Sequence, residues 1–156
     1  MWWEINLLKS QHWELWNLWM QAHRVLTQDV ERRLQAEFGI SKAEFSVLAT
    51  LSMSPAAAMK VQDLVQSLGW EKSRVAHQLS RMESRGFVAR AEGTKGGRRT
   101  AIVLTPEGHR MAKVTILAHG ENIRQVFFDT LSPQQAEVIR EWSAQVIAAK
   151  SSCFRL

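Results

Sequence analysis

Apolar residues recur at three- and four-residue spacings along most of the chain, which is the period of an amphipathic helix. Two short apolar runs, 87–90 and 101–104, break this pattern on either side of a glycine-rich stretch and predict a β-hairpin. The expected fold is therefore mainly α with a small β-wing. The predicted helices cover about residues 10–37, 42–53, 61–68, 71–85, 106–129 and 133–150.

Three sequence signals mark where the predicted helices begin and end. Ser41 and Glu44 have the spacing of a capping box, and Thr105 precedes a proline at the first position of the next helix. Gly69 lies between the third and fourth helices, where a left-handed cap is favoured. Two short helices joined by such a turn are a helix-turn-helix signature.

The net charge of +5 is confined to one part of the chain. Between Trp70 and Arg99 there are eight basic and three acidic residues, whereas the remaining residues balance. A neutral scaffold with one cationic segment is typical of a protein that binds a polyanion. A solvated charged face has the same composition, so the fold of this segment decides between the two interpretations.

The predicted helix at 71–85 has an apolar stripe of Val75, Leu79 and Met82, which leaves a basic side free. Arg and Gln form bidentate hydrogen bonds with base edges in the major groove, and Ser and Lys suit phosphates. A solvated face held by pairs of opposite charge is disfavoured, because this side contains no acid. The residues of this helix expected to contact DNA are Lys72, Ser73, Arg74, His77, Gln78 and Arg81.

The predicted hairpin tip, residues 92–99, combines glycines with positive charge. Lys95, Arg98 and Arg99 are expected to contact DNA, because an arginine on a narrow projection suits a narrow minor groove. A generic exposed hairpin would account for the glycines but not for the neighbouring arginines. A helix-turn-helix followed by a basic hairpin is the winged-helix arrangement.

Several segments resemble the multiple antibiotic resistance regulator (MarR) family. Residues 68–75 resemble its turn and recognition helix, and 79–90 end in Arg-Gly-Phe-Val-Ala-Arg where the family has Gly-Leu-Val-x-Arg. Residues 103–108 contain Leu-Thr-Pro-Glu-Gly, which matches the Leu-Thr-x-x-Gly exit from its wing, and 127–135 resemble its linker into the last dimerisation helix. Where the family has an acid that orients the wing arginine this chain has Gly96, so Arg98 and Arg99 are rival candidates for the minor groove.

The resemblance implies a homodimer with a winged-helix lobe at 38–106 and a helical dimerisation region formed by 1–37 and 107–156. The composition supports partner helices independently, because five of the seven tryptophans fall in the first nineteen residues. Two recognition helices related by a two-fold axis would contact half-sites about one helical turn apart, so a near-palindromic operator is expected.

The family also implies a small aromatic or anionic effector, bound between the dimerisation layer and the DNA-binding lobe. The candidate residues are Trp13, Trp16, Met20 and His23 on the first helix, with Trp70 near the floor of the crevice. The alternative is that these side chains pack in the core and the dimer interface, which is the commoner use of a Trp and Met stripe.

Other classes of protein find little support in the sequence. The five histidines lack metal-ligand spacing, the single Cys153 reads as an inert thiol, and no phosphate-binding loop or nucleophile motif occurs. We therefore expect no enzyme activity, cofactor or metal. The sequence shows no apolar run that would span a membrane and no secretory signal, so a cytoplasmic protein is expected.

The sequence thus predicts a homodimeric repressor that binds double-stranded DNA and is relieved by a small effector. The alternative is an architectural or protein-interaction factor that binds DNA without sequence specificity.

Overall fold

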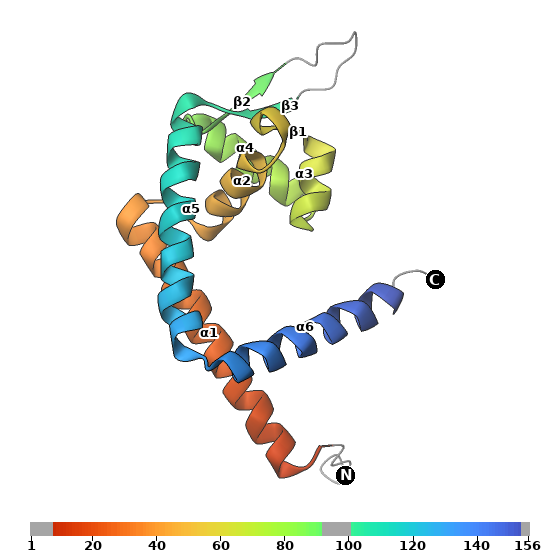
Figure 1. The fold of residues 1–156 in the computed structure, drawn as a ribbon. Coiled ribbons are helices and arrows are strands. Elements are labelled where there is room, and N and C mark those ends of the chain that lie inside the picture. Colours follow the sequence, from red (N-terminus) through yellow and green to blue (C-terminus); the bar gives the residue numbers. More distant parts are fainter. Residues whose placement is uncertain (1–7, 92–100, 154–156) are drawn as a thin grey trace, which may run out of the picture. The chain divides into compact units, whose positions relative to one another are not determined.

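The computed structural model describes residues 8–91 and 101–153, and Figure 1 shows the order of the elements. The chain forms two compact units, Met1–His119 and Gly120–Leu156. Lys95, Arg98 and Arg99 of the predicted hairpin tip lie outside the described residues.

The predicted helices are confirmed, with ends that differ by a few residues. The first unit also contains a short strand and a 3-10 turn that were not predicted. Its elements are α1 (Ser10–Phe38), α2 (Lys42–Ser52), η1 (Pro55–Ala57), β1 (Ala58–Lys60), α3 (Val61–Leu68), α4 (Lys72–Ser84), β2 (Val88–Ala91), β3 (Ala101–Leu104) and most of α5 (Pro106–Val126).

The hairpin strands belong to a three-stranded antiparallel sheet with the order β1-β3-β2. Ala58 lies opposite Val103, and Val88 lies opposite Leu104. β1 was missed because three residues are too few to show an alternating pattern. It occupies the free edge of β3, so the helix-turn-helix and the hairpin form one lobe.

One apolar core holds this lobe together. On α2 the buried apolar side chains are Val47, Leu48 and Leu51, while Phe45 and Ala49 are half-buried. The buried apolar residues are Leu34, Ile40, Val47, Leu48, Leu51, Ala57, Leu64, Val75, Leu79, Met82, Phe87, Val88, Ile102, Leu104, Met111 and Ala112.

The start of α5 is anchored to the short segment between α4 and β2. The Thr105 hydroxyl accepts a hydrogen bond from Gly108 N at 3.0 Å and donates to the Gly86 carbonyl oxygen at 2.5 Å. A Cβ atom at position 108 would lie 1.9 Å from the Phe87 carbonyl oxygen, so only glycine fits there. This close approach gives the Leu-Thr-x-x-Gly pattern a physical reason.

The N-terminal half of α1 lies largely outside the core. Trp13, Leu15 and Trp16 are 50%, 69% and 52% exposed, and Leu18, Met20 and Val25 are also exposed. Although α1 is long and rich in tryptophan, neither it nor any other helix of the described part is apolar enough to cross a membrane.

The second unit contains the end of α5, η2 (Phe128–Thr130) and α6 (Pro133–Cys153). Arg124 pairs with Glu121 at 2.6 Å and with Asp129 at 2.7 Å, which ties the last turn of α5 to η2. The Arg124 hydrogen bond holds the pKa of Glu121 down to about 2. Ser132 and Gln135 form the capping box of α6. The large apolar side chains Val138, Trp142, Val146 and Ile147 of this helix are exposed.

Candidate nucleic-acid interface

The inner side of α4 packs on the core through Val75, Leu79 and Met82, as predicted. Gln78 also lies on this inner side with only 7% of its surface exposed, and its Nε2 has no hydrogen-bond partner among the described residues. The expectation that Gln78 shares the exposed basic face is therefore wrong. It lies one position before Leu79 and three after Val75, so it falls at the edge of the apolar stripe.

The outer side of α4 is exposed over its whole length. Its central line, directly opposite the buried residues, consists of Ser73, His77, Ser80 and Ser84, which recur at helical spacing. Arg74 and Arg81 are exposed along one edge of this line, and Lys72 is exposed in the first turn. The outer side therefore presents small polar groups in the middle and long cations beside them.

Arg85 and Arg90, which follow the last turn of α4, are used within the fold. Arg85 pairs with Glu44 at 2.5 Å, and Arg90 pairs with Glu83 at 3.0 Å. Within the described residues no acid pairs with Lys72, Arg74 or Arg81. The positive charge available to a ligand on this part of the lobe is thus concentrated on α4.

Arg85 fixes the end of α4 against the start of α2. Its second guanidinium nitrogen donates to the Gly39 carbonyl oxygen at 3.0 Å, and its carbon lies 4.8 Å from the centre of the Phe87 ring. Glu44 is buried, yet it also accepts hydrogen bonds from the backbone N and the hydroxyl of Ser41. Burial alone would raise the pKa of Glu44, but the hydrogen bonds from Ser41 and Arg85 outweigh it and lower that pKa.

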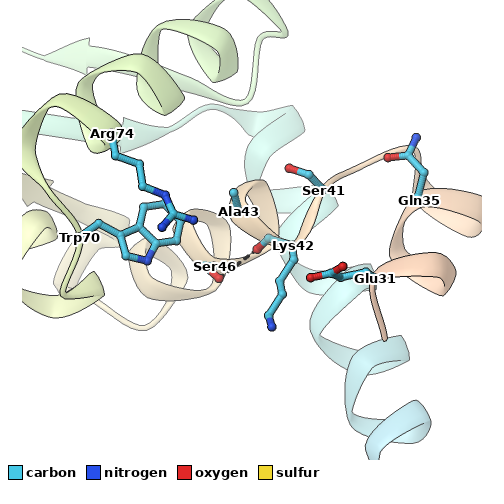
Figure 2. A pocket seen from close by; sticks show the side chains of 8 residues that line it. All are labelled: Glu31, Gln35, Ser41, Lys42, Ala43, Ser46, Trp70 and Arg74. Atoms are coloured by element: carbon cyan, nitrogen blue, oxygen red, sulfur yellow. Dashed lines mark hydrogen bonds between the residues drawn. The ribbon is translucent and has the colours of Figure 1, made fainter. Parts of the chain in front are cut away.

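The start of α4 borders an open depression of about 620 Å³. Figure 2 shows Arg74 stacked on the Trp70 ring at one side, with Lys42 and Glu31 reaching in from the other. The Arg74 guanidinium carbon lies 4.2 Å from the ring centre. The lining residues are Glu31, Gln35, Ser41, Lys42, Ala43, Ser46, Trp70 and Arg74.

The structure brings one of the five predicted effector residues to this depression. Trp70 lines it, whereas Trp13, Trp16, Met20 and His23 do not. Those four side chains are exposed along the N-terminal half of α1. The lining residues that sequence reasoning missed, Lys42 above all, carry no distinctive local pattern, because α1, α2 and the turn before α4 meet only in the folded lobe.

Metal-binding groups are scattered in the described part of the chain, where no three His, Cys, Asp or Glu side chains gather. His119 is a half-buried example, with its ring 4.5 Å from that of Phe45. Burial, together with the charge of Lys42, lowers the pKa of His119 and keeps it neutral at pH 7.

Two solved structures resemble this chain over nearly its whole length. AbsC, a MarR family transcriptional regulator from Streptomyces coelicolor, is 26% identical and superimposes with a TM-score of 0.84 over 93% of this chain and 97% of its own. Sco3205, a MarR family regulator from the same organism solved in complex with DNA, is 26% identical with a TM-score of 0.82 over 91% and 89% of the two chains. The chain belongs to the MarR family of winged-helix transcriptional regulators.

Two further comparisons also match transcriptional regulators. The transcriptional regulator HosA of Escherichia coli is 27% identical over 119 residues, which are 76% of this chain and 86% of HosA. The family profile described as the sugar-specific transcriptional regulator TrmB matches residues 34–106. That match covers the winged-helix lobe but not the N-terminal part of α1 or α6.

Membership in the MarR family makes the chain a transcriptional regulator and not an enzyme. Glu44 also holds the end of α4 through Arg85, a role that the sequence did not predict. Its capping-box spacing with Ser41 was visible, but the contact with Arg85 joins residues far apart in the sequence and could be found only in the structure.

Proposed function

We propose that this MarR family protein is a homodimeric repressor that binds a near-palindromic DNA operator through α4. The observation that carries the proposal is the exposed outer side of α4, where Lys72, Arg74 and Arg81 have no acidic partner among the described residues. Small side chains in the middle of that side allow the helix to approach base edges, and the cations beside them suit phosphates and guanines. The relative Sco3205 was solved in complex with DNA, which supports the same use here.

Residue roles follow from position on the helix. We assign base contacts to Arg74 and His77, and backbone contacts to Lys72, Ser73 and Arg81. Lys95, Arg98 and Arg99 remain the proposed wing contacts. Gln78 is left out, because its side chain would have to leave the core to reach DNA.

A binding-site selection from random DNA, followed by salt titration, tests the proposal. We expect a selected palindrome to stay bound at a salt concentration that releases scrambled DNA, because phosphate contacts are strongly screened whereas base contacts are not. Arg74→Ala should lower the preference for the selected site by about 1–3 kcal/mol, whereas Arg110→Ala, which removes a cation from α5, should leave it unchanged. Equal salt sensitivity on both DNAs would instead support the non-specific architectural alternative.

The dimer is proposed from the exposed apolar residues of α1 and α6. We assign 1–37 and 107–156 to the dimerisation region and 38–106 to the DNA-binding lobe. Trp13, Trp16, Met20 and His23 then serve the contact with the second copy. Sedimentation at micromolar concentration should show a dimer, and a stable monomer would remove the argument for paired half-sites.

Relief by an effector is proposed from the depression beside α4. Its volume of about 620 Å³ is in the range of small-molecule sites, and Lys42, Arg74 and Trp70 suit a small aromatic or anionic ligand. A ligand there would compete with DNA for Arg74, and such differential affinity is what shifts a binding equilibrium. Release of labelled operator by a panel of aromatic acids tests this, with Lys42→Gln expected to weaken the response and Lys113→Gln to leave it unchanged. We place the regulator in the cytoplasm, where its operator would lie.

A further inference from the structure

Trp70 occupies the turn that leads into the recognition helix. Gly69, immediately before it, ends α3 in a left-handed conformation with φ 63°, and Glu71 after it is the N-cap of α4. The Trp70 side chain is half-buried and packs against the apolar core of the lobe. The buried side of the ring is therefore supported by core residues of the lobe.

The exposed part of the Trp70 ring supports Arg74, one helical turn further along. The guanidinium carbon lies 4.2 Å from the ring centre, within the range in which a cation is attracted to the face of an indole. Arginine has large rotamer entropy, so a surface arginine without such a support must be ordered when it binds. The contact with the Trp70 ring favours one orientation of the Arg74 guanidinium in the free lobe.

Arg81 provides an internal comparison. It lies on the same edge of α4, two turns further along, and is exposed. Within the described residues its side chain has neither an acidic partner nor an aromatic ring beneath it. Arg85 is stacked on Phe87 but is also paired with Glu44, so it is committed to the fold. Arg74 is thus the cation of α4 that is both positioned and free of an acid.

We propose that Trp70 is a positioning residue for sequence recognition, which holds the Arg74 guanidinium ready for a base edge. The inference rests on the proposed DNA-binding function and adds a residue that does not itself touch a base. It predicts different roles for the two arginines. Arg74 contributes discrimination between DNA sequences, and Arg81 contributes affinity for any duplex. A competing interpretation is that the ring holds Arg74 away from DNA, in which case neither residue affects discrimination.

A double-mutant cycle on the full chain tests the proposal, with the ratio of affinities for the selected and a scrambled duplex as the readout at fixed salt. Trp70→Leu should lower this ratio by about 2- to 5-fold, the range expected for an exposed cation–π contact. Trp70→Phe keeps a ring and should lose less. In the Arg74→Ala background Trp70→Leu should cause no further loss, because the residue that it positions is absent. Arg81→Ala should weaken binding to both duplexes equally.

The possible results distinguish a failure of the proposed DNA-binding function from a failure of the positioning role of Trp70. A wild-type protein with no preference for the selected duplex would contradict the proposed function itself. Discrimination that depends on Arg74 but is unchanged by Trp70→Leu, or falls equally in both Arg74 backgrounds, would overturn the positioning role alone.

A second measurement does not depend on a folded Trp70→Leu variant. Side-chain nitrogen relaxation in the free wild-type protein should show a more ordered guanidinium at Arg74 than at Arg81. Equal mobility of the two groups would overturn the proposal, even if Trp70→Leu fails to fold.

Discussion

The winged-helix lobe and the N-terminal half of α1 use apolar side chains in opposite ways. In the lobe Val47, Leu64 and Leu79 are fully buried, and polar groups close the ends of the helices. Along α1 Trp13, Leu15 and Trp16 keep half or more of their surface exposed. Large apolar surface of this kind is a mark of protein–protein contact. The lobe therefore completes its own core, whereas the start of α1 leaves large apolar side chains exposed, and the two regions should respond differently to substitution.

The largest effect is expected where the lobe is tightest, at Gly108. A methyl group there would lie 1.9 Å from the Phe87 carbonyl oxygen, so β2 or α5 must shift. We expect Gly108→Ala to lower the free energy of unfolding by about 3 kcal/mol or more, at the upper end of overpacking effects. Denaturant unfolding at fixed protein concentration measures it.

Gly120→Ala is the matched control, because nothing lies within 4 Å of its added methyl group. It should raise stability by up to about 1 kcal/mol through helix propensity. Similar losses for both substitutions would show that the loss at position 108 does not come from the contact with Phe87.

The next largest effect is expected on the exposed apolar surface of α1. Trp16→Glu places a charge on the exposed apolar surface of α1 and should weaken dimerisation by about 2–3 kcal/mol, as expected for an interface tryptophan. The lobe should keep its fold, because Trp16 is not part of the core cluster. Analytical ultracentrifugation measures association, and circular dichroism checks the helical content.

Gln21→Glu is the control for the added charge on the same helix. Its polar side chain is exposed, so we expect dimerisation to change little. A Trp16→Glu protein that dimerises as tightly as Gln21→Glu would remove the assigned role of the α1 surface.

A smaller effect is expected at the ion pair that joins α2 to the end of α4. Arg85→Ala leaves the buried Glu44 without its cation and should lower stability by about 2 kcal/mol, discounted because Arg85 itself is partly exposed. Arg110→Ala is the control, since its pair with Glu107 is exposed to solvent and should contribute little to stability.

The same pair gives a pH dependence with a defined sign. The pKa of Glu44 is lower in the folded protein than its ordinary value of 4.5, so its stabilisation is fully present above that value. The stabilisation is lost as the pH falls through the folded pKa. The stability difference between wild type and Arg85→Ala should therefore shrink in acid, and a difference that does not shrink as the pH falls would contradict the assigned role of Glu44.

The contrast between the two regions also explains what could be predicted from the sequence. The helices of the lobe were predictable because their apolar periodicity and end signals agree: the capping box at Ser41 and the left-handed Gly69 occur as expected. β1 was missed because its pairing with β3 depends on a strand more than forty residues away. Local patterns identify helices, whereas sheet edges are decided by the folded neighbourhood.

The candidate site followed the same rule. The exposed Arg74, His77 and Arg81 could be predicted from residue type and helical spacing, whereas Gln78 was misplaced because a polar residue at the edge of an apolar stripe can fall on either side. The stacking of Arg74 on Trp70 was not predicted, because nothing in the sequence shows how the turn before α4 packs on the core. The charged residues of the site could thus be predicted from the sequence, whereas the side-chain contacts that position them could not.

The smallest expected effect lies at the turn between α2 and β1. Ala56 has φ 54° and ψ 19°, a left-handed conformation that costs an L-residue roughly 1–2 kcal/mol and costs glycine little. Because glycine also loses more backbone entropy on folding, Ala56→Gly should raise stability by a net ~0.5 kcal/mol. Ala43→Gly in the right-handed α2 is the control and should lower stability by about 1 kcal/mol. Ala56 is exposed and belongs to the lobe, so dimerisation should not change. Loss of stability in Ala56→Gly would mean that chain entropy outweighs the strain of this turn.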